Sequence, residues 1–348
     1  MEQAKVSALE GWLEKELDAD FLRLDPPSKM SGGAIQENWR LDAEVTGGPH
    51  AGKLPLVLRT DAPSGVSISH PRNHEFALLK VAFAAGVSVP EPLALDAEGV
   101  VLRKPAYVMR RASGTANPRA LARDAALDTH RPAITEALGR ELARIHSIGP
   151  GHADLGFLPL DDRSPIKRRI DEFVAQLDAL PDAHPILEYG IRWLHHNAPD
   201  SQATALGHGD FRCGNLMIDP ADGGRVTAVL DWEFAGWSDP MEDVGWLCAR
   251  CWRFGADDRR VGGIGILEDF IPGYEAETGH GLDWAALPFW EMLATVRWAI
   301  IARHQGQRHL SGEENSIELA LTGRKAAEME YDILTHIRQI ADTKGKTG

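Results

Sequence analysis

A short polar string in the second half of the chain limits its possible folds more than any other feature of the sequence. The string HGDFRCGN begins at His208, with Asp210 third and Asn215 last, and two short strands joined by the turn DPADGG follow it before Asp231. A hairpin brings the chain back to its starting point, so Asp231 is expected beside Asn215. An amide oxygen and a carboxylate would then converge, which suits Mg²⁺ because this ion keeps water and phosphate oxygens as its remaining ligands.

Asp210 and Arg212 supply the other groups that phosphoryl transfer requires. Asp210 can accept the proton of an attacking hydroxyl group, and Arg212 can reach the γ-phosphate and neutralise charge in the transition state. The spacing D-x-x-x-x-N, followed by an acid after a hairpin, matches the kinase pattern. HGD alone would more often be a surface turn and DWE the end of a strand, but the combination favours catalysis. His208 is expected to brace the loop rather than to transfer protons.

The period of the hydrophobic pattern changes along the chain. In the first part, strand-like alternation and helical spacing predict a helix at about 6–17, strands at 35–43 and 54–59, a helix at 72–85 and a strand at 106–109. Helical spacing dominates afterwards, at about 133–146, 166–180, 186–197 and from 288 onward. Together with the D-x-x-x-x-N motif, these patterns predict an α+β, two-lobed protein-kinase-like fold. Residues 1–111 would form a β-rich, nucleotide-binding lobe with one helix, and residues 112–348 a mostly helical catalytic and substrate-binding lobe across a cleft.

The predicted first lobe offers residues suited to nucleotide binding. Ser31, Gly32 and Gly33 precede a strand, so their backbone N–H groups could approach phosphate. Arg59 ends a strand and Glu75 lies early in the next helix, the order in which kinases place a phosphate-binding cation and its supporting acid. Taken singly, a Gly-Gly pair is weak evidence, and the two charged residues would more often be solvated. Their order along the chain favours the functional interpretation.

With these parts in place, the string HGDFRCGNLMID…VLDWEFAGWSDPMEDVGWL resembles the aminoglycoside phosphotransferase and choline kinase superfamily. Within it, the sequence most resembles the phosphotransferases related to the kinase-like domain of certain acyl-CoA dehydrogenases. The similarity covers nearly the whole chain, including MSGGAIQENWRL, LPLVLRTDAP, HEFALLKVAFAAGVSVPEPL and YVMRRASG. It implies that hinge backbone binds adenine, which points to Met109, Arg110 and Ala112. It also implies that Asp243 is structural or lies near the substrate, and is not a metal ligand.

The sequence departs from the pattern of its relatives at two positions. Arg59 stands where protein kinases commonly carry lysine, but arginine keeps its charge and can bind phosphate through two nitrogens. Arg110 stands at a hinge position where relatives often carry an acid. Because hinge hydrogen bonds to the base come from the backbone, this difference would alter nucleotide preference at most.

Composition excludes several other classes of protein. The net charge of −14, from 51 acidic and 37 basic residues, argues against non-specific nucleic-acid binding, which needs clustered cations. No apolar run approaches the ~18 residues of a membrane span, so no membrane association is expected. Three cysteines suit a reducing cytoplasm, and Cys248 and Cys251 are interpreted as core residues because a lone CxxC lacks further metal ligands. The oligomeric state stays open.

Two further patterns look functional and are set aside. The string GGPHAGK, from Gly47 to Lys53, fits GxxxxGK, but Leu54 stands where a Walker motif needs Ser or Thr and a strand follows in place of a helix. It is interpreted as a hairpin turn. His70 and His74 are spaced like metal ligands, but the HExxH order is missing and proline intervenes.

The sequence therefore predicts a small-molecule kinase that uses Mg²⁺ and ATP, with GTP possible, to phosphorylate a hydroxyl acceptor. Inactivation of an aminoglycoside or macrolide antibiotic is an alternative, although metabolic phosphorylation of a hydroxy acid, a choline-like alcohol or a sugar is favoured. A nucleotide-binding pseudokinase scaffold predicts the loss of a base or a metal ligand, and neither is missing. A protein kinase is disfavoured because no APE-like segment follows Asp231.

Overall fold

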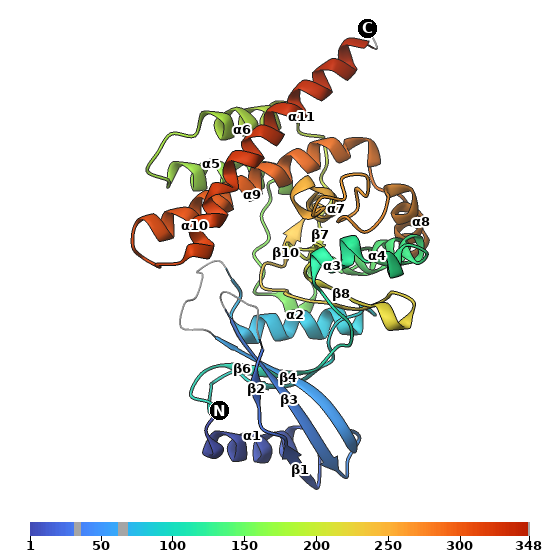
Figure 1. The fold of residues 1–348 in the computed structure, drawn as a ribbon, viewed down its shortest axis with the longest axis vertical. Coiled ribbons are helices and arrows are strands. Elements are labelled where there is room, and N and C mark those ends of the chain that lie inside the picture. The colour runs from blue at the N-terminus through green and yellow to red at the C-terminus, as the bar shows by residue number, and fades with distance from the viewer. Residues whose placement is uncertain (31–35, 62–68, 347–348) are drawn as a thin grey trace. The chain divides into compact units, whose positions relative to one another are not determined.

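The computed structural model describes residues 1–30, 36–61 and 69–346, and these fall into two compact units (Figure 1). The first unit comprises Met1–Ala116, Gly151–Leu158 and Asn215–Ala235. The second unit comprises Asn117–Pro150, Pro159–Gly214 and Gly236–Gly348. Each unit is thus assembled from separate stretches of the chain, and the chain passes from the second unit to the first between Gly214 and Asn215.

An antiparallel sheet dominates the first unit, with the strand order β1-β3-β4-β6-β5 and β2 paired to β3. The strands are β1 (Phe21–Leu24), β2 (Ser28–Lys29), β3 (Gln36–Thr46), β4 (Gly52–Asp61), β5 (Pro92–Asp96) and β6 (Ala106–Arg110). The string GGPHAGK begins in the turn between β3 and β4, where Gly47 and Gly48 have φ near +70°, a conformation that favours glycine. The predicted hairpin turn at this place is confirmed.

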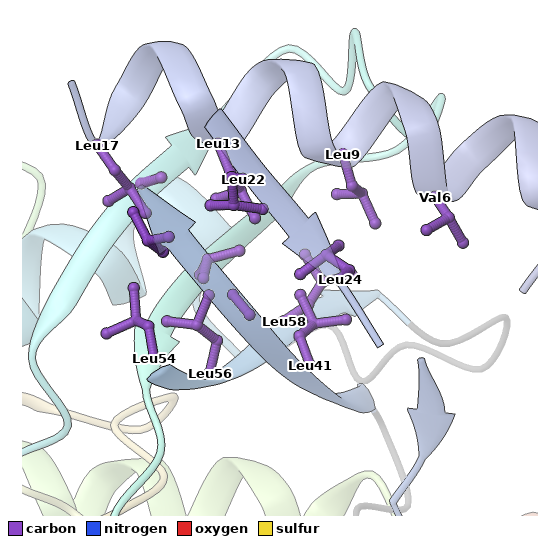
Figure 2. Close-up of a cluster of buried hydrophobic side chains, with 14 of the residues drawn as sticks. Val6, Leu9, Leu13, Leu17, Leu22, Leu24, Leu41, Leu54, Leu56 and Leu58 are labelled. Carbon is purple, nitrogen blue, oxygen red and sulfur yellow. The ribbon is translucent and has the colours of Figure 1, made fainter. Parts of the chain in front are cut away.

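The helix α1 (Gln3–Glu16) covers one face of this sheet (Figure 2). Its apolar residues recur every three to four positions and therefore lie along one side of the helix. They pack on leucines of β1, β3 and β4 in a buried cluster that includes Val6, Leu9, Leu13, Leu17, Leu22, Leu24, Leu41, Leu54, Leu56 and Leu58. Burial of each leucine side chain contributes roughly 1.5–3 kcal/mol to folding, so this cluster fixes the position of the strands.

Two glutamates of α1 also bind the outer side of β1. The backbone N–H of Leu22 donates to Glu14 Oε1 at 2.9 Å, and that of Leu24 donates to Glu10 Oε1 at 3.0 Å. β1 stands at the end of the strand order and pairs with β3 on its other side. The helix therefore accepts hydrogen bonds from backbone N–H groups that would otherwise be available to a neighbouring strand.

The rest of the first unit is a helix and a hairpin. The helix α2 (Arg72–Ala84) packs against β5 and β6, and the short helix η2 (Ala153–Leu155) packs against α2. The hairpin consists of β8 (Leu216–Asp219) and β9 (Arg225–Val229), with the turn helix η3 (Pro220–Asp222) between them. The backbone N–H of Val229 donates to Ser88 O at 2.7 Å, which ties the hairpin to the segment after α2.

The second unit is mostly helical. Its α-helices are α3 (Pro118–Arg123), α4 (Arg131–His146), α5 (Pro165–Asp178), α6 (Pro185–Asn197), α7 (Pro240–Cys248), α8 (Leu267–Thr278), α9 (Leu287–Leu310), α10 (Ile317–Arg324) and α11 (Ala326–Lys346). Short 3-10 helices lie at η1 (Ala125–Leu127), η4 (Arg250–Trp252) and η5 (Trp284–Ala286). The strands β7 (Ala205–Gly207) and β10 (Gly236–Ser238) form a small antiparallel pair.

The helix α9 forms the centre of the second unit, where α6, α7, α10 and α11 pack against it. The segment Trp284–Leu310 is long and apolar enough to cross a membrane by length and composition, but 67% of its most apolar window is buried inside the protein, as in a core helix. At Gly245 of α7 the two helices meet closely, because a Cβ at this position would lie 2.5 Å from Trp290 Cβ. Glycine is therefore required here for steric reasons.

Candidate active site

The β8–β9 hairpin brings Asn215 and Asp231 together at its open end, as the sequence predicted. Leu216 pairs with Val229, and the N–H of Leu230 donates to the carbonyl oxygen of Asn215 at 2.8 Å. Asn215 is buried, whereas the Asp231 side chain is 29% exposed. Asp231 has φ of +70°, a backbone conformation that turns the chain sharply after β9. The amide and the carboxylate are thus presented by adjacent backbone segments of one hairpin.

Arg59 of β4 joins Asp231 to Glu75 of α2. Its Nη2 lies 2.6 Å from Asp231 Oδ1 and 2.9 Å from Glu75 Oε1. Arg72 also binds the Glu75 carboxylate. Arg59 and Glu75 are buried, so their pairing gains strength from the low local dielectric. The ion pair between the strand cation and the helix acid is therefore present, and its contact with nucleotide phosphates stays a prediction.

Glu233 lies two residues beyond Asp231, and the sequence analysis gave it no role. Its Oε2 accepts a hydrogen bond from Gln36 Nε2 at 2.6 Å, and its side chain is buried. Burial raises the pKa of Glu233 to about 8, with the charge of Asp231 adding to the rise and Arg59 opposing it. The sequence DWE places the two acids close together, and this spacing was the one available signal that they would interact.

The remaining residues predicted for the nucleotide can be placed in part. Ser31, Gly32 and Gly33 lie outside the described residues. Met109 is buried in β6, and Arg110 ends the same strand, where its Nε lies 2.7 Å from Glu91 Oε2.

Two backbone N–H groups of this predicted hinge already donate hydrogen bonds within the protein. The N–H groups of Arg110 and Arg111 donate to Glu91 O and Pro55 O, both at 2.9 Å, and Ala112 follows the strand. The binding of a base by this segment stays a prediction.

In the second unit, Asp243 of α7 holds the backbone of the HGD loop. Its Oδ2 accepts the N–H of His208 at 2.6 Å, and its Oδ1 accepts the N–H of Gly209 at 2.9 Å. The Nε2 of His146 lies 3.4 Å from the same carboxylate. Burial alone would raise the pKa of Asp243, but hydrogen bonds and electrostatic attraction from His146 and His208 hold it below its ordinary value. Asp243 therefore orders the loop, and the backbone N–H of Asp210 also donates to His208 Nδ1 at 3.1 Å.

The carboxylate of Asp210 is buried and accepts hydrogen bonds from two side chains of its own unit. Arg212 Nε lies 3.0 Å from Oδ1 and 3.2 Å from Oδ2, and Trp246 Nε1 donates to Oδ1 at 2.8 Å. The guanidinium of Arg212 also stacks on Trp252, with 4.6 Å to the ring centroid. Arg212 is thus tied to the candidate base, and its predicted contact with the γ-phosphate stays a prediction.

The sequence analysis missed Trp246 and Arg297 as neighbours of the HGD loop. Neither residue was given a role from the sequence. Arg297 Nη2 donates to Gly209 O at 2.8 Å, and its guanidinium stacks on Trp246 at 4.4 Å from the ring centroid. Both contacts join residues far apart in sequence, so no local spacing could reveal them.

The histidines and cysteines that the sequence analysis set aside as metal ligands make packing contacts and hydrogen bonds or are at least half-buried in the protein. The ring of His74 stacks on Phe157 with centroids 3.9 Å apart, and His70 Nε2 lies 2.7 Å from Ala235 O. Cys248 is buried and Cys251 half-buried, and both thiols are unpaired. Within residues 1–30, 36–61 and 69–346, no group of three or more His, Cys, Asp and Glu side chains is arranged to hold a metal ion.

Comparison with known proteins places these features in a family. Residues 28–288, most of the chain, match the model of the phosphotransferase enzyme family. The chain belongs to the phosphotransferase enzyme family. Over 305 residues this phosphotransferase-family chain is 30% identical to acyl-CoA dehydrogenase family member 10 of Mus musculus, covering 80% of the chain and 27% of the mouse protein. The chain thus spans about a quarter of that relative's length.

Solved structures of the phosphotransferase family share the fold. A Ralstonia eutropha JMP134 protein named as a candidate aminoglycoside phosphotransferase matches 96% of this chain and 98% of its own, with a TM-score of 0.74 and 22% identity. A thermostable aminoglycoside phosphotransferase mutant in complex with ADP and hygromycin B matches 95% of this chain and 98% of its own, with a TM-score of 0.59 and 17% identity. The predicted α+β, protein-kinase-like fold and the predicted family resemblance are both confirmed.

Proposed function

We propose that this chain is a magnesium-dependent kinase that transfers the γ-phosphoryl group of ATP, or of GTP, to a hydroxyl group of a small molecule. The observation that carries the proposal is the buried carboxylate of Asp210, held by Arg212 and Trp246 in a loop whose backbone Asp243 anchors. A phosphotransferase needs such a fixed acceptor for the proton of the attacking hydroxyl. The relative solved with ADP supports a nucleotide as the donor.

Asp210 is the proposed base. The acceptor oxygen attacks the γ-phosphorus, and the bond from this phosphorus to the oxygen that bridges it to the β-phosphate breaks. The hydroxyl proton passes to Asp210, and the products are a phosphate ester and a nucleoside diphosphate. Arg59, supported by Glu75, would hold the α- and β-phosphates, and Arg212 would offset charge on the transferred group.

Asn215 and Asp231 are the proposed magnesium ligands. The fit rests on their chemistry and backbone placement, since one amide oxygen and one partly exposed carboxylate are presented by adjacent segments of the hairpin. When bound, the ion would neutralise charge on the phosphate oxygens. Arg59 now pairs with Asp231, so binding would require Arg59 to share or release one carboxylate oxygen.

The acceptor and the cellular setting belong to the same proposal. Metabolic hydroxyl compounds are favoured over antibiotics because antibiotic enzymes are a minority of the superfamily that the sequence resembles. The three unpaired cysteines support a reducing, cytoplasmic setting. A pseudokinase scaffold is the competing function, and the presence of Asp210, Asn215 and Asp231 disfavours it.

The test is a nucleotide-consumption screen with ATP and GTP in separate reactions. The acceptor panel contains aminoglycosides, macrolides, hydroxy acids, amino alcohols and sugars. The variant Asp210→Ala should lose at least ~100-fold in turnover while still binding nucleotide. The exposed Asp200 offers a matched control, since Asp200→Ala should keep full turnover. Full activity of Asp210→Ala, or nucleotide binding by a wild-type chain that transfers to no compound, would reject the proposed function.

A further inference from the structure

Asp210 belongs to a closed ring of side-chain contacts in the second unit. Arg212 binds its carboxylate and stacks on Trp252, the Trp252 ring contacts Trp246 with centroids 5.2 Å apart, and Trp246 Nε1 returns to Asp210 Oδ1 at 2.8 Å. Both tryptophans are buried, with 3% of the surface of Trp246 and 7% of that of Trp252 exposed. Trp246 is the ring member that reaches the carboxylate from a helix outside the loop.

Trp246 is itself held from two directions. On its face lies the guanidinium of Arg297, 4.4 Å from the ring centroid, and this cation also donates to Gly209 O at 2.8 Å. Along α7, the adjacent Gly245 packs directly against Trp290 of α9. The indole therefore has little freedom to rotate or shift. A cation over the ring face also draws electron density from the indole, which strengthens its N–H as a donor.

On these contacts we propose that Trp246 is a positioning residue, which fixes the orientation of the Asp210 carboxylate by an indole N–H bond that Arg297 supports. The role rests on the proposed function, in which Asp210 accepts the hydroxyl proton. A carboxylate that rotates loses part of the gain from alignment, since proton transfer requires a donor–acceptor distance near 2.6–3.2 Å. Trp246 reaches Asp210 from α7, the helix whose Asp243 also anchors the loop backbone. One helix would thus set both the path of the loop and the direction of its functional side chain.

The decisive variant is Trp246→Phe, which removes the N–H and keeps an aromatic ring. The free energy of a hydrogen bond to a charged group corresponds to a loss of about 10- to 100-fold in kcat. The KM values for nucleotide and acceptor should change less than about threefold. Replacing Trp246 by β-(3-benzothienyl)alanine, which has sulfur in place of N–H in a ring of similar size, should give the same loss. This second variant keeps the test valid if the phenylalanine variant folds poorly.

Trp284 provides a matched control in the same unit. Its Nε1 donates to Glu275 Oε1 at 3.0 Å, so Trp284→Phe removes an indole–carboxylate hydrogen bond of the same kind away from the HGD loop. This variant should keep its kcat within about twofold of the wild type. Equal kcat losses in the two phenylalanine variants would identify a general stability effect and overturn the proposal. A kcat within twofold of the wild type for folded Trp246→Phe would also overturn it.

The assay uses the panel compound that gives the fastest nucleotide consumption, and Asp210→Ala is measured beside the tryptophan variants. Activity of Asp210→Ala equal to the wild type would reject the proposed function itself. Loss of activity in Asp210→Ala together with wild-type kcat in Trp246→Phe would reject the positioning role alone. An independent readout is the indole ¹⁵N–¹H spectrum, in which Asp210→Ala should shift the Trp246 signal and leave that of Trp284 in place. An unshifted Trp246 signal would contradict the hydrogen bond.

Discussion

Arg59 and Asp231 form an ion pair with 2.6 Å between Nη2 and Oδ1, although they are 172 positions apart in the sequence. The contact joins the residue proposed to hold nucleotide phosphates to a residue proposed to bind magnesium. A metal ion at Asp231 would compete with the guanidinium for the same oxygen, and phosphate oxygens would offer the guanidinium an alternative partner. Metal and nucleotide binding should therefore favour each other.

Changing Asp231 to asparagine should weaken magnesium binding. The variant keeps one side-chain oxygen but loses the negative charge that attracts both Mg²⁺ and Arg59. We expect the Mg²⁺ concentration for half-maximal nucleotide binding to rise about tenfold or more, equivalent to about 1.4 kcal/mol. Calorimetric titration of nucleotide at a series of Mg²⁺ concentrations measures this change. Asp219→Asn, at the turn end of the same hairpin, is the control, and the same magnesium dependence in both variants would exclude Asp231 as a ligand.

Replacing the buried Arg59 by methionine should destabilise the protein strongly. The substitution leaves Glu75 buried with one fewer cation, although Arg72 still pairs with it, and breaking a buried ion pair costs about 3–5 kcal/mol. Arg40 of β3 pairs with Asp42 but is 55% exposed, so Arg40→Met should cost less than about 1 kcal/mol. Urea unfolding of the two variants compares these costs. Similar losses would show that burial does not strengthen the Arg59 pair.

Asp243→Asn should make the protein less stable near neutral pH. It should also remove the loss of stability that protonation of Asp243 causes in acid. The pKa of Asp243 lies below its ordinary value in the folded state, so its stabilising effect is fully present above about pH 4 and is lost as the pH falls further. The difference in unfolding free energy between wild type and variant should therefore stay constant between about pH 7 and pH 4 and shrink as the pH falls below about 4. Urea unfolding across this range measures it. With Asp257→Asn, at an acid that is 54% exposed, the difference should stay small at every pH.

Alanine substitution should have opposite effects at two helical glycines. Gly245→Ala places a Cβ 2.5 Å from Trp290 Cβ, so α7 and α9 must separate, and we expect a loss of about 1–3 kcal/mol. At Gly11 of α1, apart from the helix's own nearby backbone and the two neighbouring residues, no atom lies within 4 Å of the new Cβ, and Gly11→Ala should stabilise the protein by about 0.5–1 kcal/mol. Thermal unfolding distinguishes the two signs. A neutral Gly245→Ala variant would contradict the close packing of the helices.

Local sequence patterns were sufficient for much of the fold. The alternation at 35–43 and 54–59 predicted β3 and β4, because alternate apolar residues of each strand belong to the buried cluster that α1 covers. The helical spacing at 72–85 predicted α2 to within a residue. β1 was missed because four residues are too short for an alternation to stand out, and its position depends on pairing with β3. The helix α8 was also missed, and Pro272 inside it obscures the pattern.

Some contacts of the candidate site could likewise be predicted from local sequence patterns, and others could not. The hairpin that brings Asn215 beside Leu230 could be predicted from turn residues and strand length. The Arg59–Glu75 pair could be predicted from the order of a strand cation and a helix acid. The Trp246–Asp210 hydrogen bond could not, because it depends on how the second unit packs around α7 and α9, and packing between distant segments leaves no periodic trace in the sequence.

The glutamates of α1 that bind β1 have a practical consequence for anyone who shortens this chain. A version that begins at Phe21 would lose Glu10 and Glu14 and uncover the apolar face of the sheet, so the N–H groups of Leu22 and Leu24 would be open to a strand from another molecule. Such a truncated chain should aggregate through this edge, and light scattering would detect the aggregates. We therefore expect the first helix to keep the sheet from polymerising.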